Sequence, residues 1–277
     1  MLKIDAHQHF WQYDKTAHSW ISDEMNILRK DYMPPELKAE MDKSGYDGCV
    51  AVQAAQSEEE TNFLLQLADE YDYIKGVVGW VDLQDFNVKA RLAHFARYPK
   101  LCGFRHIVQH EADDFLLNPA FMRGVRLLPE FNLSYDLLIY ERQLPVAMQF
   151  VSYMPGCRLV VDHIAKPLIA KSEISTWQQN LRSLGQYGHV YCKLSGMVTE
   201  ADWQQWKPED IRPYLEVALE AFGPDRLMIG SDWPVCRLAA SYQEVMGVVE
   251  DFISTLSDNE QAGILGQNAI RFYQLEV

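Results

Sequence analysis

The sequence predicts an α/β protein, a (β/α)8 TIM barrel built as a single domain over residues 1–277. Three observations support this prediction. The chain has 277 residues, close to the roughly 250 that one such barrel occupies. Eight short apolar, β-branched runs recur along it, and most are followed by a polar loop and an apolar pattern of helical period. Several runs, such as RLVVD from Arg158 and RLMIG from Arg226, are continuously apolar, as is typical of parallel strands covered on both faces.

The expected strands are 2–6, 49–53, 74–83, 103–108, 133–139, 159–162, 190–194 and 227–230. Helical patterns between them include 60–71, 88–98 and 208–222. Pro208 suits the first turn of the last of these, and Gly223 suits its end. Ser257 and Glu260 have the spacing of a capping box before a final helix through Phe272.

An open doubly wound sheet also alternates strands with helices. Such a sheet usually carries a glycine-rich phosphate turn after its first strand, whereas this chain reads DAHQHFW there. The barrel is therefore favoured. The longest excursion between elements is 10–35, and its aromatic residues suit either a loop that closes one end of the barrel or a lid over substrate.

Composition excludes several classes of protein. With 48% hydrophobic residues the chain can build a core, so it is neither disordered nor fibrous. Its formal charge of −14 has the wrong sign for nucleic acid or anionic membranes. We see no apolar run long enough for a signal peptide or a membrane span, and five cysteines without a CxxC pair suggest a reduced, cytoplasmic protein. Homo-oligomer formation is left open.

Polar and titratable residues follow almost every expected strand. In a barrel the C-terminal ends of the strands face one cavity, so these side chains predict an active site there. The residues are Asp5, His7, His9, Gln53, Gln56, Trp80, Asp82, Arg105, His106, Tyr140, Asp162, His163, Lys166, Lys193, Ser195, Ser231, Asp232 and Trp233.

His7 and His9 are two residues apart, so both imidazoles point to the same side of an extended strand. Such a pair alone is a weak indication. Together with His163 and Asp232, it forms a plausible set of ligands for one Zn²⁺ or another borderline divalent ion. A substrate carbonyl could bind at the same point.

The chain resembles the amidohydrolase superfamily and, within it, the sugar-lactonase branch typified by L-fuconolactonase and L-rhamnonolactonase. The resemblance extends from the first strand to NAIRFYQL near the end. It rests on the motifs IDAHQHFW, GVVGWVDL, GFRHIV, YDLL, VVDHIAKP, CKLSGMVTEA and GSDWPVC.

The resemblance implies hydrolysis of a sugar-acid lactone by water, with Asp232 as general base. It also implies metal binding through the first-strand histidines, histidines on strands five and six, Asp232, and often a carboxylated lysine or a glutamate on strand four. This chain departs from that pattern, because 132–140 holds no histidine and strand four offers Arg105 and His106. We therefore expect at most one divalent ion, Zn²⁺ before others, or none, since related pyrone dicarboxylate lactonases work without metal.

The predicted roles divide into two groups. His163 acts with Asp232 in catalysis, while His7, His9, His163 and Asp232 are the candidate metal ligands. The candidate substrate-binding residues are Arg105, His106, Trp80, Lys193 and Trp11.

Each assignment has a structural alternative. Asp232 could cap a turn. Arg105 could pair with Asp82 or Asp162, and Lys193 could bridge to an acid at the rim. The tryptophans could pack in the core or the walls.

Two other functions stay open at this point. A non-oxidative decarboxylase of an aromatic acid would use a similar set of three histidines and an aspartate. A non-catalytic sugar-binding barrel would need no base.

Overall fold

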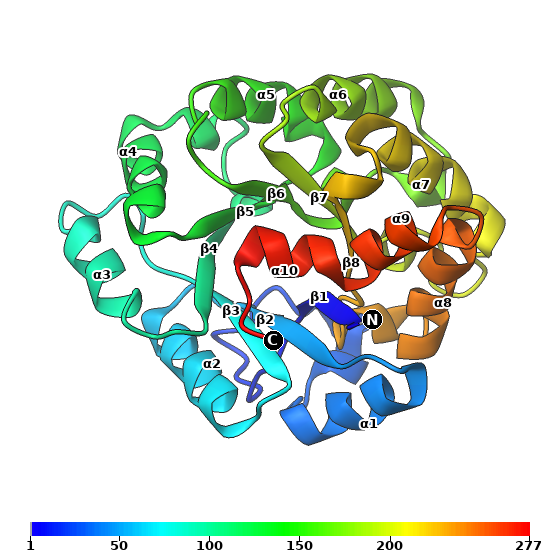
Figure 1. Ribbon diagram of the computed structural model, residues 1–277, viewed down its shortest axis with the longest axis horizontal. Helices are drawn as coiled ribbons and strands as arrows, with labels where there is room; N and C mark the ends of the chain where they lie inside the picture. Colours follow the sequence, from blue (N-terminus) through cyan, green and yellow to red (C-terminus); the bar gives the residue numbers. More distant parts are fainter. Residues whose placement is uncertain (1) are drawn as a thin grey trace.

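Eight parallel strands form a barrel in the computed structural model, which describes residues 2–277 (Figure 1). Met1, the first residue of the expected domain, lies outside the described residues. Neighbours in the sheet follow chain order, which confirms the predicted TIM barrel. The strands are β1 Ile4–Gln8, β2 Gly48–Val52, β3 Ile74–Gly79, β4 Leu101–Ile107, β5 Ser134–Leu138, β6 Leu159–Val161, β7 Val190–Leu194 and β8 Leu227–Ile229.

The helices form a ring around these strands (Figure 1). Among residues 2–277, none is both long and apolar enough to cross a membrane. The helices are α1 Pro34–Ser44, α2 Glu58–Glu70, α3 Val88–Phe95, α4 Pro119–Leu127, α5 Leu144–Ser152, α6 Ser175–Gly185, α7 Pro208–Phe222, α8 Tyr242–Ile253, α9 Asp258–Ala262 and α10 Asn268–Tyr273.

Two element predictions differ from the structure. The expected third strand reached residue 83, but β3 ends at Gly79 because the Trp80 amide donates to the Thr61 hydroxyl on α2 instead of continuing the ladder. The capping box at Ser257 is confirmed, but the final helix is divided into α9, a π-helical turn over Gly263–Gln267, and α10. A side chain at Gly266 would lie 2.2 Å from the Leu2 carbonyl oxygen, so this turn packs directly against the backbone before β1.

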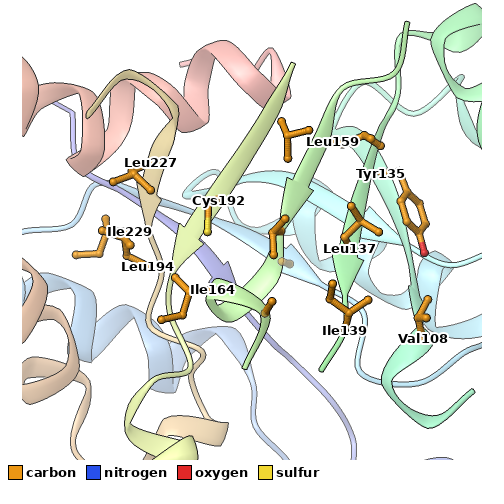
Figure 2. Packing of buried hydrophobic residues seen from close by; sticks show 14 of the residues in the cluster. Val108, Tyr135, Leu137, Ile139, Leu159, Ile164, Cys192, Leu194, Leu227 and Ile229 are labelled. Atoms are coloured by element: carbon orange, nitrogen blue, oxygen red, sulfur yellow. The ribbon is translucent and has the colours of Figure 1, made fainter. Parts of the chain in front are cut away.

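Residues of each strand are buried on both faces of the sheet. Along β6, Leu159 and Val161 belong to the large apolar cluster that includes residues of the helices, whereas Val160 belongs to a second cluster with residues of α10. Figure 2 shows the first cluster over β5 to β8. The continuously apolar runs in the sequence are explained by this two-sided burial.

The barrel closes between β8 and β1 through the residues that follow each strand. Gln8 and Trp233 form a parallel bridge. The His9 amide donates to the Trp233 carbonyl at 2.7 Å, and the Asp232 amide donates to the His7 carbonyl at 2.8 Å. The backbone closure itself therefore places the paired histidines beside Asp232.

The segment between β1 and α1 forms a closed loop over one side of the barrel. Trp11 and Tyr32 exchange two backbone hydrogen bonds of 3.1 and 2.9 Å at its base. The Trp11 side chain is buried, and its indole nitrogen donates to the Lys30 carbonyl. Trp11 therefore holds the loop together.

Inside the barrel lies a cluster of fully buried charges. The Lys193 ammonium is 2.6 Å from an Asp136 carboxylate oxygen and 3.0 Å from Asp162, and the Arg105 guanidinium is 3.0 Å from Asp162. The Tyr273 hydroxyl of α10 donates to Asp136 at 2.7 Å. These contacts join β4, β5, β6 and β7 to the last helix, and we call them the core ion cluster.

Replacing Lys193 with methionine should destabilise the protein strongly, because it leaves two buried carboxylates without their shared cation. We expect the Lys193→Met change to lower the free energy of unfolding by roughly 3–5 kcal/mol. Lys89→Met, which removes a largely exposed pair with Glu130, should cost less than about 1 kcal/mol. Denaturant unfolding of both variants checks this, and equal losses would contradict it.

Candidate active site

A small cavity of about 80 Å³ opens at the C-terminal ends of the strands. It contains four of the predicted site residues, His9, Arg105, His163 and Asp232. A larger cavity of about 510 Å³ near the start of α6 contains none of them. The remaining residues that line the small cavity are Trp20, Ala54, Ile107, Gln109, His110, Leu138, Lys166 and Val235.

Three imidazoles surround one carboxylate oxygen in this site. The Nε2 atoms of His9, His7 and His163 lie 3.3, 3.8 and 3.9 Å from Asp232 Oδ1. The Nε2 atoms of His7 and His9 are 3.2 Å apart. The residues that the sequence placed after strands one, six and eight therefore do converge.

Each imidazole is held at its other nitrogen. His9 Nδ1 donates to the Val52 carbonyl at 2.7 Å, and His163 Nδ1 lies 2.9 Å from the Ser195 hydroxyl. His7 Nδ1 is 3.3 Å from Asp162 and 3.0 Å from Lys193. With Nδ1 occupied in all three rings, the Nε2 atoms are the ones presented to Asp232.

The backbone around His163 and Asp232 adopts an uncommon conformation. His163 and the three residues after it all have positive φ, as does Asp232 at 55°. Gly196 also has positive φ, and a Cβ there would lie 2.5 Å from His163 Nδ1, so only glycine leaves room for this ring. Strained residues of this kind persist where the surrounding structure fixes them, and they cluster at functional sites.

The electrostatics keep the Asp232 carboxylate charged and lower the pKa of two imidazoles, His7 and His163. Burial alone would raise the pKa of Asp232, but His163, His9 and His7 around it hold that pKa below its usual range. Burial lowers the pKa of His163 to about 4, and burial together with the nearby Lys193 lowers that of His7. At neutral pH, Asp232 can therefore accept a proton.

The donor set fits one divalent ion. The ligand atoms of His7, His9 and Asp232 all lie within 4.8 Å of one another. Ligands held at about 2.0–2.1 Å by a tetrahedral Zn²⁺ stand about 3.3 Å apart, close to the 3.2 Å between the two Nε2 atoms. The strand-four position implied for a second ion is held by Arg105, whose Nη1 is 3.3 Å from His7 Nε2.

Four predicted substrate contacts lie outside the cavity. Lys193 is fully buried in the core ion cluster and does not line the cavity, and the acids that it bridges lie inside the barrel and not at its rim. Its contact with substrate stays a prediction. Trp80 donates to His106 at 3.3 Å, and His106 also pairs with Glu111 at 3.0 Å, which ties both rings into the wall. Trp11 is the fourth, and it holds the loop over the barrel.

Arg105 forms an ion pair and also faces the cavity. It pairs with Asp162, not with Asp82, and it lines the cavity.

Sequence reasoning missed part of the rim. Trp20 comes from the long loop, where no periodicity indicates direction, and its indole nitrogen donates to the Ala54 carbonyl at 3.1 Å. Gln109 and His110 lie in a short turn just past β4. Lys166, which the sequence places after strand six but to which no role was assigned, lines the cavity and pairs with Glu200 at 3.3 Å.

Comparison with known proteins identifies the family. Residues 4–275 match the family model described as amidohydrolase. The chain belongs to the amidohydrolase family.

This amidohydrolase is similar to two curated relatives and to a solved structure. It is 44% identical to an L-fucono-1,5-lactonase of Burkholderia multivorans and 34% identical to one of Burkholderia ambifaria, each over 99% of this chain and 96% of the relative. A crystal structure of an amidohydrolase from Burkholderia multivorans with bound zinc is 44% identical over the full length of both chains, with a TM-score of 0.97.

The stability of this amidohydrolase, freed of metal by a chelator, should decrease in acid because of His163. Folded His163 stays neutral down to about pH 4, whereas the unfolded side chain binds a proton near pH 6.5. Between these values the unfolded state binds more protons, so the His163 contribution to stability is present above pH 6.5 and is lost as the pH falls toward 4.

We therefore expect the difference in unfolding free energy between wild type and His163→Asn to shrink from pH 7 to pH 4.5. Denaturant titrations at several pH values measure this difference. A difference that grows on acidification would contradict the assignment.

Proposed function

We propose that this amidohydrolase hydrolyses a sugar-acid lactone, similar to L-fucono-1,5-lactone, to the aldonic acid. The observation that carries the proposal is the buried Asp232 carboxylate with three imidazole Nε2 atoms 3.3 to 3.9 Å away. The names and identities of the two Burkholderia lactonases support it.

Lactone hydrolysis requires a base for water, polarisation of the carbonyl and a proton for the leaving alkoxide. Asp232 takes a proton from water as the water oxygen adds to the carbonyl carbon. The same carboxyl group then returns the proton to the ring oxygen as the ring C–O bond breaks. His163 and His9 keep the carboxylate charged and in place.

His7, His9, His163 and Asp232 would hold a divalent ion, for which we propose Zn²⁺. Such an ion supplies Lewis-acid polarisation of the carbonyl when bound. The zinc-bound structure of the Burkholderia multivorans amidohydrolase supports this choice.

The cavity has a polar and an apolar side, as a sugar ring does. Arg105, Gln109 and Lys166 offer hydrogen bonds, while Ile107 and Val235 offer apolar contact. The proposal includes a reducing compartment such as the cytoplasm, because all five cysteines are free and buried. It also includes a role in carbohydrate metabolism, because the proposed substrate is a sugar-acid lactone.

A panel of aldonolactones with a pH indicator tests the proposal, with Asp232→Asn as the matched variant. We expect wild type to release one acid per turnover and the variant to be about 10²–10⁴-fold slower. Asparagine keeps the size of the side chain but accepts no proton from water, so thermal unfolding should change little.

Two results would overturn parts of this proposal. No lactone rate above the spontaneous one, with CO₂ release from an aromatic acid, would support the decarboxylase instead. A variant that keeps most of its activity would remove Asp232 from the mechanism.

Metal content should not exceed one divalent ion per chain, with moderate dependence of the rate upon it. Arg105 is already 3.3 Å from His7 Nε2, and β5 provides no histidine. Elemental analysis of the purified protein, before and after chelation, measures the stoichiometry. Two tightly bound ions per chain would show the expectation to be wrong.

A further inference from the structure

Arg105 is a buried cation that faces the cavity. It lies near the end of β4, its side chain is 3% exposed, and it lines the cavity together with His9 and Asp232. Its Nη1 atom and the Asp232 Oδ1 atom lie 3.3 and 3.8 Å from the same nitrogen, His7 Nε2. The cation and the proposed base therefore stand at the same end of the cavity.

Three residues hold the guanidinium in one orientation. Nε donates to Gln53 Oε1 at 2.9 Å, Nη2 donates to the Gln53 carbonyl, and Nη1 donates to Asp162 at 3.0 Å. The second N–H of Nη1 is directed to His7 Nε2. A guanidinium has five N–H groups, so one on Nη2 is left for a ligand.

The imidazoles are poorly suited to donate to a carbonyl. His9 Nδ1 donates to the Val52 carbonyl, and its Nε2 lies 3.3 Å from Asp232 Oδ1. His7 does not line the cavity, and its Nε2 lies 3.3 Å from Arg105 Nη1 and 3.8 Å from Asp232 Oδ1. His163 Nε2 likewise lies 3.9 Å from Asp232 Oδ1, so the imidazole Nε2 atoms are directed at this carboxylate and not at a bound carbonyl.

The donors at the rim are held less firmly than Arg105. The Trp20 indole donates to the Ala54 carbonyl, Lys166 pairs with Glu200, and the Gln109 amide nitrogen contacts His110. Arg105 is thus a firmly preorganised donor on the cavity wall, with one N–H left for a ligand.

We propose that Arg105 is a catalytic residue that donates to the lactone carbonyl oxygen and stabilises the oxyanion formed when water adds. This inference rests on the proposed function. As the water oxygen bonds to the carbonyl carbon, its proton passes to Asp232 and the carbonyl π pair moves to the oxygen held by Arg105. When the tetrahedral intermediate collapses, the ring C–O bond breaks and the ring oxygen takes the proton from Asp232. The substrate C=O double bond re-forms at the same time, which gives the aldonic acid.

The deciding comparison uses Arg105→Lys with two substrates, a hydroxylated aldonolactone and unsubstituted δ-valerolactone. Lysine keeps the positive charge, but its single ammonium group cannot donate to Gln53 and Asp162 in the planar, forked geometry of a guanidinium. We expect kcat to fall about 10²–10³-fold with KM within a few-fold, and by similar factors for both lactones. Arg182→Lys, which alters an exposed pair with Glu220, is the matched control and should keep wild-type rates.

Chemical rescue provides an independent measurement. The Arg105→Ala variant should lose as much activity, and guanidinium chloride below its denaturing concentration should restore part of it. Urea, which is neutral and of similar shape, and sodium chloride at equal ionic strength should not. This measurement also decides the question if wild type turns over δ-valerolactone too slowly for the first comparison.

Gln53→Ala covers the case in which both arginine variants fail to fold, as circular dichroism would show. It leaves the buried charge pair in place but frees the guanidinium, so kcat should fall about tenfold with KM nearly unchanged.

The inference is overturned if Arg105→Lys keeps most of the wild-type kcat, or if the loss is confined to KM and to the hydroxylated lactone. Unchanged kcat in Gln53→Ala, where it is the only folded variant, overturns it as well. Wild type that hydrolyses no lactone would instead refute the proposed function, so the two failures are distinguishable.

Discussion

The position of the active-site groups depends on the core ion cluster. Lys193 lies between Asp136 and Asp162, and Arg105 approaches Asp162 from the next strand. A buried ion pair is weak evidence for added stability, because desolvation offsets most of the Coulomb attraction. Its effect here is positional, since His7 and Arg105 both take their orientation from Asp162. The cluster therefore links the barrel interior to the cavity.

The charge of this cluster is nearly balanced within the barrel. Burial raises the pKa of Asp136 to about 6 against the opposing effect of Lys193, whereas Lys193, His7 and Arg105 outweigh burial and keep the pKa of Asp162 well below its usual range. The Tyr273 hydroxyl adds a hydrogen bond to Asp136 from the last helix. The C-terminal segment thus contributes to the same network as the strand ends, although it lies far from them in the sequence.

The sequence predicts the barrel well because the two-sided burial of parallel strands leaves continuous apolar runs. It also predicts that His7 and His9 converge with His163 and Asp232, since each follows a strand at the same end of the barrel. It does not indicate how deep a polar side chain lies. Lys193 and Arg105 are both polar residues near the ends of strands, yet only Arg105 reaches the cavity.

Two neighbouring residues illustrate a second limit of prediction from the sequence. Arg105 and His106 are consecutive on β4, and consecutive side chains point to opposite faces of a strand, so both could not line the cavity. The alternation of side chains along the strand excludes one of the two residues from the cavity but does not show which one. The structure places His106 in the wall, stacked on Phe115 with ring centroids 4.8 Å apart. Trp20 lacks any such pattern, because the long loop that carries it is fixed by tertiary contacts.

The charges of Asp232 and Arg105 also affect product release in the proposed reaction. A lactone is neutral, whereas the acid that it yields is an anion at neutral pH. That anion forms beside Asp232, which is ionised again once it has returned its proton to the ring oxygen. Charges interact strongly in a small cavity of low dielectric, and Arg105, a cation that lines the cavity, is already paired with Asp162. Repulsion between the two carboxylates therefore favours departure of the product in the proposed reaction.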